Sequence, residues 1–476
     1  MHLARKEHYP FLLLITLVAV IRLLLAPHVG LGVDEAHYLL YAMHLDLSYF
    51  DHPPLVGWVQ ALFTSIFGSG EFGTRTSAIF IGFLVSIFLY KFTYMIHKST
   101  HEAFVAVLAL HGTFIFNALF MMLMPDTLLF LFIIPIIFSV IAVQNSGSIK
   151  SWLLLGLLLG LAGLSKYTAI LFIPPIILYV LLKRRYDLLY TPKLLLTLGV
   201  AILVISPVLI WNIQNDWLSF TYQSEHVIGA KHINWQGFIK SISAQFFAYN
   251  PFLMPLAFYG LYKSFTSKND TLLLSALFGL VLILFFTYAS LYKSALPHWS
   301  ALFYLLFIPI GTLFFLEKST KFITFAVGIG LLLSTFAYIE LRYKIIPFPK
   351  YKSIHRDIYG FDTIMQKANE EIKESSKEVL GVTNWTLASR AIYYNRNYPS
   401  KVYLIDKRHD QFDLWEKNMP IGKDVIFINT HFFHKDIEKT MRCNAVSKLS
   451  SFDLKINTMI EDSIEFILCT NFQGMK

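Results

Sequence analysis

The chain has 476 residues, of which 55% are hydrophobic and only 15% are charged. Soluble domains carry roughly 25% charged residues, so this composition excludes an ordinary soluble enzyme and requires lipid to cover much of the surface. The net charge of +9 does not indicate a nucleic-acid partner, because the Lys and Arg residues lie mainly in short loops and form no basic stripe.

Apolar runs dominate residues 1–341. A helix needs about 20 apolar residues to cross a bilayer, and about eleven runs approach that length. They lie at residues 9–28, 74–96, 102–121, 126–143, 151–165, 168–183, 194–212, 250–265, 271–290, 298–316 and 321–341. The first run is too long for a signal peptide and lacks a small-residue cleavage site, so we expect it to be retained. The sequence predicts a polytopic α-helical membrane domain.

The loop charges predict the orientation of these helices. Arg5 and Lys6 precede the first run, and every second loop after it is rich in Lys and Arg, which marks the cytoplasmic side. An odd number of spans then leaves the C-terminal part outside the cell, in the periplasm if the organism is Gram-negative. The long loops 29–73 and 213–249 fall on the same outer face, so we expect the chemistry there, in a multi-pass protein of the inner (plasma) membrane.

The first long loop contains two segments with apolar residues at helical spacing. They are DEAHYLLYAMHL (34–45) and PPLVGWVQALFTSIFG (53–68). This pattern predicts amphipathic helices that lie at the membrane interface.

Residues 342–476 have the composition of a soluble domain. Strand-like runs (VLGVT, KVYLI, DVIFINT, SIEFILCT) alternate with the helical runs 361–376 and 434–446, which predicts a small extracytoplasmic α/β domain. Cys443 and Cys469 are the only cysteines. An oxidising compartment would let them pair, and two buried free thiols are an equal alternative.

Ionisable residues next to apolar runs are the first functional candidates, because charge near a membrane is expensive. Asp34 and Glu35 directly follow the first run, and Asp51 and His52 lie further along the same loop. Asp126 follows Pro125 at the start of another run, where capping a helix is the structural alternative.

These residues lie in stretches that resemble a known family. The segment LGVDEAHYLLYAMHLDLSYFDHPPLVGW resembles the first outer loop of bacterial GT-C superfamily glycosyltransferases, the relatives of protein O-mannosyltransferases and of the lipid A aminoarabinose transferase. Weaker matches are MPD (124–126), LSKYTA (164–169), SPVLIWNIQNDWLSFTYQSEH (206–226), ALPHWSALFYL (295–305), LGVTNWTLASRAIYYN (380–395) and QFDLW (411–415). The aminoarabinose transferase has Glu-Lys-Pro-Pro where this chain has Asp-His-Pro-Pro at 51–54, which argues against the same sugar.

The resemblance implies inverting transfer of a sugar from a polyprenyl-phosphate-linked donor to an acceptor at the outer face of the inner membrane. The acceptor would be lipid A, lipopolysaccharide, a surface glycan or a protein. Asp34 matches the acidic residue of the family's first loop and is the candidate general base, with Glu35 beside it. Asp126 matches a second acidic position and is expected to help bind the acceptor or a metal.

The chemistry of such a transfer requires a base near the attacking hydroxyl and cations near the departing phosphate. Lys166, Lys293 and Arg22 are the candidate phosphate ligands. Snorkelling to the interface is the alternative for Lys166, and pairing with a carboxylate is the alternative for Arg22.

Histidines on the predicted outer face are candidates for substrate or metal binding. They are His37, His52, His226 and His298, with Asp51 beside them. Imidazole and carboxylate suit a divalent ion, but no compact metal motif is present, so interfacial histidines paired with carboxylates are the alternative. No other cofactor is expected.

A polytopic lipid or sugar transporter, or flippase, is the alternative function. Transporters place polar residues near the midplane and often repeat one half of the chain in the other. Here the polar residues cluster at one predicted face and no halves match, which favours the enzyme.

Overall fold

The computed structural model describes residues 5–228, 232–293 and 295–476, apart from the side chains of residues 225–228. Contacts divide the chain into two compact units. The helical unit comprises Met1–Leu24, Asp46–Val59 and Arg75–Ala337. The sheet unit comprises Leu25–Leu45, Gln60–Thr74 and Tyr338–Lys476. Part of the first predicted outer loop therefore folds with the C-terminal residues.

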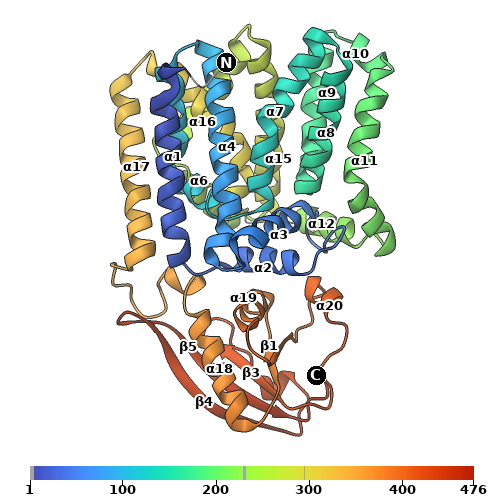
Figure 1. Cartoon of the computed structure of the whole chain (residues 1–476), viewed down its shortest axis with the longest axis vertical. Coiled ribbons are helices and arrows are strands. Elements are labelled where there is room, and N and C mark those ends of the chain that lie inside the picture. The colour runs from blue at the N-terminus through green and yellow to red at the C-terminus, as the bar shows by residue number, and fades with distance from the viewer. Residues whose placement is uncertain (1–4, 229–231, 294) are drawn as a thin grey trace. The chain divides into compact units, whose positions relative to one another are not determined.

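The longest helices of the helical unit have roughly parallel axes and form a bundle (Figure 1). Its helices are α1 (Tyr9–Leu25), α4 (Glu71–His97), α5 (Thr100–His111), α6 (Phe114–Leu119), α7 (Pro125–Ser146), α8 (Ile149–Ser165), α9 (Ile173–Leu182), α10 (Asp187–Tyr190), α11 (Lys193–Gln214), α12 (Leu218–Ile228), α13 (Trp235–Ala248), α14 (Met254–Thr266), α15 (Asp270–Tyr292), α16 (Ala301–Leu316) and α17 (Thr320–Tyr343). The 3-10 turns η3 (Tyr167–Phe172) and η4 (Pro297–Ser300) precede α9 and α16.

Seven helices in the described part of the chain are long and apolar enough to cross a membrane. They are Lys6–His28, Glu71–His97, Pro125–Ser146, Lys193–Gln214, Asp270–Tyr292, Pro297–Leu316 and Thr320–Tyr343. The other four predicted runs are helical but shorter, and the run 102–121 is divided between α5 and α6. The protein is therefore a polytopic helical membrane protein, as predicted, and the count of about eleven crossings stays a prediction.

Glycines let several helices of this unit pack closely. A side chain at Gly311 of α16 would place its Cβ 1.8 Å from the carbonyl oxygen of Leu256 in α14. A side chain at Gly156 of α8 would place its Cβ 2.5 Å from the carbonyl oxygen of Thr197 in α11. Small residues at such contacts are typical of helices that associate in lipid.

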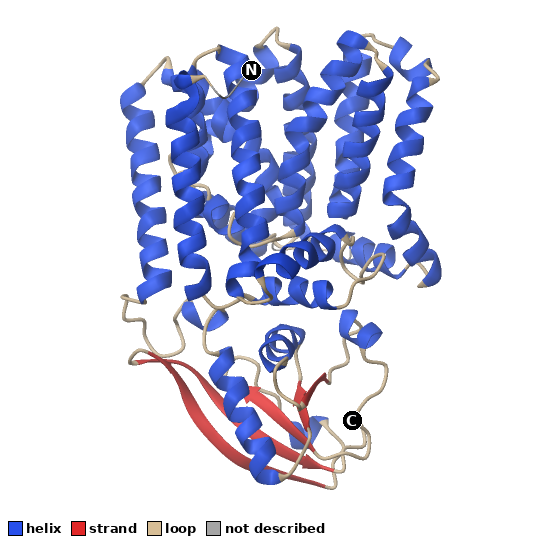
Figure 2. Cartoon of the chain, viewed as in Figure 1, coloured by secondary structure: helices blue, strands red, loops and turns tan. Residues whose placement is uncertain are grey.

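The sheet unit contains a five-stranded sheet in the order β2-β1-β3-β5-β4 (Figure 2). Strands β1 (Val379–Val382), β2 (Lys401–Leu404) and β3 (Val425–Thr430) pair in parallel, and β5 (Met459–Thr470) joins β3 and β4 (Ala445–Ile456) antiparallel. The accompanying helices are α18 (Phe361–Ser375), α19 (Trp385–Asn395), α20 (Gln411–Trp415) and α21 (Ile437–Thr440). The predicted soluble α/β domain is confirmed.

The predicted helix over 434–446 is mostly wrong. Only Ile437–Thr440 is helical, and β4 already begins at Ala445. Cys443 and Cys469 form a disulfide that joins this segment to β5, so the extended pairing of β4 with β5 replaces a longer helix.

Both amphipathic segments of the first loop are helices, α2 (Val33–Met43) and α3 (Leu55–Phe67). The apolar side of α2 lies in the core of the sheet unit, where Leu39 and Leu40 pack in one cluster with Leu387 and Ala388 of α19. This helix therefore buries its apolar residues against protein.

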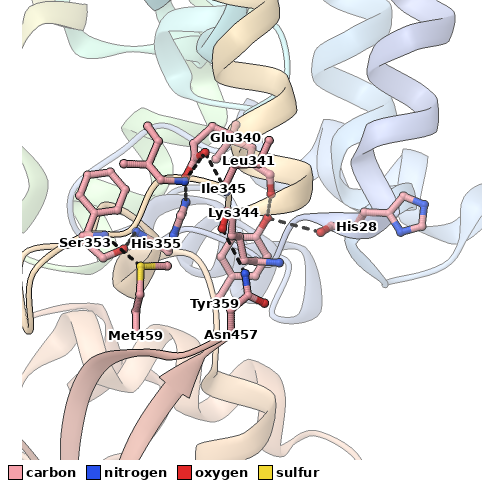
Figure 3. A network of polar contacts seen from close by, with 12 residues as sticks. His28, Glu340, Leu341, Lys344, Ile345, Ser353, His355, Tyr359, Asn457 and Met459 are labelled. Atoms are coloured by element: carbon pink, nitrogen blue, oxygen red, sulfur yellow. Dashed lines mark hydrogen bonds and ion pairs between the residues drawn. The ribbon is translucent and has the colours of Figure 1, made fainter.

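A buried polar network holds the C-terminal end of α17 within the sheet unit (Figure 3). Glu340 is 3% exposed, and its Oε2 accepts hydrogen bonds from the backbone amides of Ile345 and Ile346 at 3.0 and 3.1 Å. Its Oε1 lies 3.1 Å from Nε2 of the fully buried His355. The carboxylate thus terminates the helix and anchors the following segment.

Candidate active site

The centre of the candidate site in the helical unit is an ion pair between Asp126 and Lys166. Asp126 lies in the first turn of α7, directly after Pro125, and Lys166 follows the last residue of α8. The Lys166 Nζ lies 2.7 Å from both carboxylate oxygens of Asp126, and the two side chains are only 12% and 6% exposed. The helix N-cap is Met124, so Asp126 is paired with a cation instead of capping the helix.

Two histidines from the predicted set lie near this pair. His298 of η4 and His52 are both close enough to interact electrostatically with Asp126. The His52 Nε2 lies 4.0 Å from Asp51 Oδ2. The structure therefore brings together four candidates from four separate parts of the sequence.

Aromatic residues that the sequence did not single out border the same site. Tyr249 interacts electrostatically with Asp126, donates a hydrogen bond to the Pro297 carbonyl at 2.7 Å and stacks on Tyr304 with ring centroids 3.8 Å apart. These contacts hold the segment that carries His298. Tyr249 gave no signal in the sequence because it lies among many other aromatics.

A second group of polar side chains fixes the loop that carries Asp51 and His52. The Tyr167 hydroxyl lies 3.4 Å from Ser48 Oγ, Ser219 donates to the Tyr49 carbonyl at 2.9 Å, and Gln223 donates to the Asp51 carbonyl at 2.6 Å. Tyr167 directly follows Lys166, and Ser219 and Gln223 lie in the stretch 206–226, so the family resemblance was the only sequence signal for them.

Asp34, Glu35 and His37 belong to α2 of the sheet unit. The Glu35 carboxylate, 4% exposed, accepts the backbone amide of Gly32 at 3.0 Å and so closes the first turn. His37 is buried, with Nδ1 3.2 Å from Ser389 Oγ, and packs against Tyr41. Asp34 is partly buried in the same first turn. Glu35 and His37 thus have structural contacts that the sequence did not reveal.

Arg22 lies inside the helical unit, 2% exposed. It donates a hydrogen bond to Asn117 Oδ1 at 2.9 Å and lies 3.3 Å from His111 Nδ1, with its guanidinium over the Phe120 ring. These partners belong to α5, α6 and the turn after α6, so Arg22 links α1 to these segments.

Two further candidates have little structural context. Lys293 is exposed and follows the end of α15. His226 is part of α12, but its side chain lies outside the described residues.

No group of three or more His, Cys, Asp or Glu side chains is arranged to hold a metal ion in the described parts of the chain. His37 belongs to the sheet unit, whereas His52, His298 and Asp51 belong to the helical unit. Metal binding therefore stays a prediction without a defined set of ligands.

Comparisons with known proteins agree with these features. The family model described as dolichyl-phosphate-mannose-protein mannosyltransferase matches residues 51–211, a range that contains Asp126 and Lys166. The lipid A galacturonosyltransferase RgtD of Rhizobium johnstonii is 25% identical over 249 residues. That match covers 50% of this chain and 50% of RgtD, so the chain aligns with half the length of this curated relative.

Two crystal structures of ArnT from Cupriavidus metallidurans share the fold. The structure bound to undecaprenyl phosphate has a TM-score of 0.64 and the apo structure 0.62, both at 14% sequence identity. Each match covers 96% of this chain and 98% of the ArnT chain. The chain therefore has the ArnT fold, and the resemblance to GT-C superfamily glycosyltransferases is confirmed.

Proposed function

From this fold and family resemblance, we propose that the protein transfers one sugar from a polyprenyl-phosphate-linked donor to a lipid or glycan acceptor of the cell envelope. The observation that carries the proposal is the buried Asp126–Lys166 pair, which lies inside the range matched by the mannosyltransferase family model. His52 and His298 lie near this pair. One ArnT structure contains undecaprenyl phosphate, which supports a polyprenyl donor. RgtD is a lipid A galacturonosyltransferase, which supports a lipid acceptor.

The proposed step is a substitution at the anomeric carbon. The acceptor hydroxyl oxygen bonds to this carbon as the bond to the donor phosphate breaks, and the configuration inverts. The hydroxyl proton passes to a carboxylate base, and the lipid leaves as polyprenyl phosphate. Positioned cations in a site that excludes water stabilise the charge that develops on the leaving phosphate.

Lys166 is the cation we assign to the phosphate. Its ammonium is nearly buried and already fixed by both oxygens of Asp126, so little conformational entropy is lost when it meets the donor. A carboxylate whose two oxygens contact a cation is a weak base, because the cation stabilises the ionised form. Asp126 is therefore assigned to holding Lys166, and Asp34 stays the candidate base that the resemblance implies.

We also propose that the sheet unit faces the oxidising side of the inner membrane. The disulfide between Cys443 and Cys469 supports this, because disulfides are rare in reducing compartments. The loop charges favour the same orientation.

Turnover of a donor panel by the purified protein in detergent tests the proposed reaction. The panel contains radiolabelled polyprenyl-phosphate hexose, pentose and hexuronic acid, each with a lipid A fraction as acceptor. We expect the wild type to release polyprenyl phosphate from one donor and to label the lipid. Lys166→Met and Asp34→Asn should each lower kcat at least about a hundredfold.

The matched control is Asp187→Asn, which removes an exposed carboxylate paired with Arg185. It should retain wild-type turnover. Full turnover in Lys166→Met would contradict the assignment of the phosphate ligand, and full turnover in Asp34→Asn would exclude it as the base. Absence of turnover with every donor, in a preparation that also receives total envelope lipid and glycan, would count against the reaction itself.

A further inference from the structure

The sheet unit contains a pocket that the proposed transfer reaction does not use. It has a volume of about 270 Å³ and is lined by parts of α2, α19, β2 and α20 and by the segment after α20. Sites for drug-sized ligands have volumes of roughly 300 Å³ and above. The pocket therefore suits a single small ring better than an extended chain.

One wall of the pocket is aromatic. His44 stacks on Trp415 with ring centroids 4.9 Å apart and planes inclined by 28°. Phe412 packs edge-on against Trp415 at 5.5 Å, and Tyr41, which is fully buried, does so at 5.8 Å. The indole is therefore fixed by buried neighbours, and aromatic faces held in this way bind apolar ring faces at low entropic cost.

The pocket is also lined by polar residues. Asn395 and Ser400 are buried, and Asn395 Nδ2 donates to the Ser400 carbonyl at 2.6 Å. Lys401 forms an ion pair with Glu416. Asp413 accepts the backbone amide of Asp410 at 2.9 Å and lies 3.1 Å from His409 Nδ1. The charges of Lys401, Glu416 and Asp413 are thus satisfied within the protein.

Arg396 differs from these residues. It is half-buried, stacks its guanidinium 4.0 Å from the centroid of the Tyr393 ring, and donates one hydrogen bond to the Tyr393 carbonyl at 3.0 Å. Within the described residues it forms no ion pair with a carboxylate. A planar guanidinium fixed by stacking presents its remaining N–H groups as a fork that matches a carboxylate or a phosphate.

We propose that this pocket binds one sugar ring that carries an acidic group, with the ring against His44 and Trp415 and the acidic group on Arg396. The aromatic residues provide the surface for a ring face and Arg396 selects for negative charge, whereas the Asn395 amide and the Ser400 hydroxyl are already hydrogen-bonded within the protein. All the residues that line this binding site belong to the sheet unit. Its use for a sugar of the acceptor glycan rests on the function proposed above.

Binding of simple sugars to the full-length protein in detergent tests the pocket without any donor. Calorimetric titration compares D-galacturonate and D-galactose 6-phosphate with neutral D-galactose. We expect at least one acidic sugar to bind at least about tenfold more tightly than galactose. A hydrogen bond to a charged group contributes enough binding free energy to account for a difference of that size. The preferred acidic sugar then distinguishes a carboxylate from a phosphate.

Arg396→Ala should reduce the affinity for the acidic sugar to that for galactose. Lys417→Ala is the matched control, because Lys417 is exposed, adjoins the pocket residue Glu416 and does not line the pocket. Trp415→Phe, which keeps an aromatic ring, should weaken both classes of sugar, and an unchanged melting temperature would show that it is folded.

Equal binding of the acidic and neutral sugars, an unchanged affinity in Arg396→Ala, or no binding by the wild type would each overturn the proposal. Since no donor is present, these results are independent of turnover. Failure of the transfer reaction and failure of the sugar pocket are therefore separate outcomes.

Discussion

The pairing of Asp126 with Lys166 can be tested through the free energy of unfolding. Removing one partner of a buried ion pair leaves an uncompensated charge and costs about 3–5 kcal/mol. We expect Lys166→Met to destabilise the protein by about that amount, and Asp126→Asn/Lys166→Met to recover most of the loss. Thermal unfolding in detergent measures both. A double variant no more stable than the single one would show that the pair is not isolated from His298 and His52.

The carboxyl group of Asp410 predicts an unusual pH dependence. Burial raises its pKa to about 7, and it is 5% exposed while Oδ1 accepts the Phe412 amide at 3.0 Å. Because the folded state holds the proton to higher pH than the unfolded state, this group's contribution to stability is full below about pH 4 and is lost progressively up to about pH 7. Three pKa units correspond to about 4 kcal/mol.

Asp410→Asn separates this effect from helix capping, because Asn caps a helix as well as Asp does. We expect the melting temperature of the variant to exceed that of the wild type at pH 8, and the difference to shrink steadily as the pH is lowered to 5. A difference that does not vary with pH would mean that Asp410 does not titrate in this range.

Glu340 provides a test of the network at the end of α17. Its Oε2 is the acceptor for two backbone amides, and a buried donor left without an acceptor costs about 1–3 kcal/mol. We expect Glu340→Ala to destabilise the protein by about 2–4 kcal/mol. Glu340→Gln keeps an oxygen acceptor, so denaturant unfolding should show a smaller loss. Equal losses would indicate that the charge beside His355 matters more than the hydrogen bonds.

At the residue scale, the sequence identified polar candidates but not their partners. Asp126 and Lys166 stood out because each adjoins an apolar run, yet they are 40 residues apart and meet only through the packing of α7 and α8. Glu35 stood out for the same reason and His37 as a histidine on the predicted outer face, and the structure gives them hydrogen bonds to Gly32 and Ser389. Composition cannot separate a buried structural residue from a reactive one.

At the scale of elements, runs of apolar residues were a reliable signal for helices and strands. Runs of apolar residues located the long membrane helices, and the strands β1, β2, β3 and β5 followed from short hydrophobic runs. Strand β4 was missed because most of its residues are exposed or half-buried and alternate irregularly. A strand at the edge of a sheet, paired on one side only, need not show a clear period of two.

The sequence predicted α2 at the membrane interface, but an amphipathic pattern fits a membrane surface and a protein core equally well, so it did not reveal that the apolar side of α2 packs in the core of the sheet unit. In the structure Leu39 is 1% exposed within the core of the sheet unit, whereas Leu45, just after the helix, is 59% exposed. Leu39→Ala should cost about 2–5 kcal/mol of stability through the cavity it leaves. Leu45→Ala should have little effect in the same thermal unfolding assay. If Leu39→Ala had as small an effect on stability as Leu45→Ala, α2 would not be part of the core that unfolds cooperatively.

At the scale of the whole molecule, composition established a membrane protein with a soluble part, and loop charges predicted which way it faces. The side of the membrane is predicted from charge asymmetry, because Lys and Arg are retained on the cytoplasmic side during insertion. The division into units did not follow, since residues 25–45 and 60–74 join the C-terminal residues only through tertiary contacts.

The two cysteines make the orientation testable in intact cells. They are the only cysteines in the chain and they pair with each other, so the native protein should resist thiol reagents until it is reduced. Cys469→Ser leaves Cys443, which is half-buried, as the one thiol. If the sheet unit is extracytoplasmic, a maleimide that cannot cross the inner membrane should label this variant in cells with a permeabilised outer membrane.

The matched control is Lys150→Cys in a chain that lacks both native cysteines. Lys150 is exposed in the first turn of α8, in a segment that the charges predict to be cytoplasmic, so the thiol of the variant should be labelled only after lysis. Because the two variants sample segments assigned to opposite sides by the same charge argument, the reverse pattern would invert the whole topology. It would also leave the disulfide on the reducing side, where it would not persist. The orientation and the disulfide are therefore tested by one experiment.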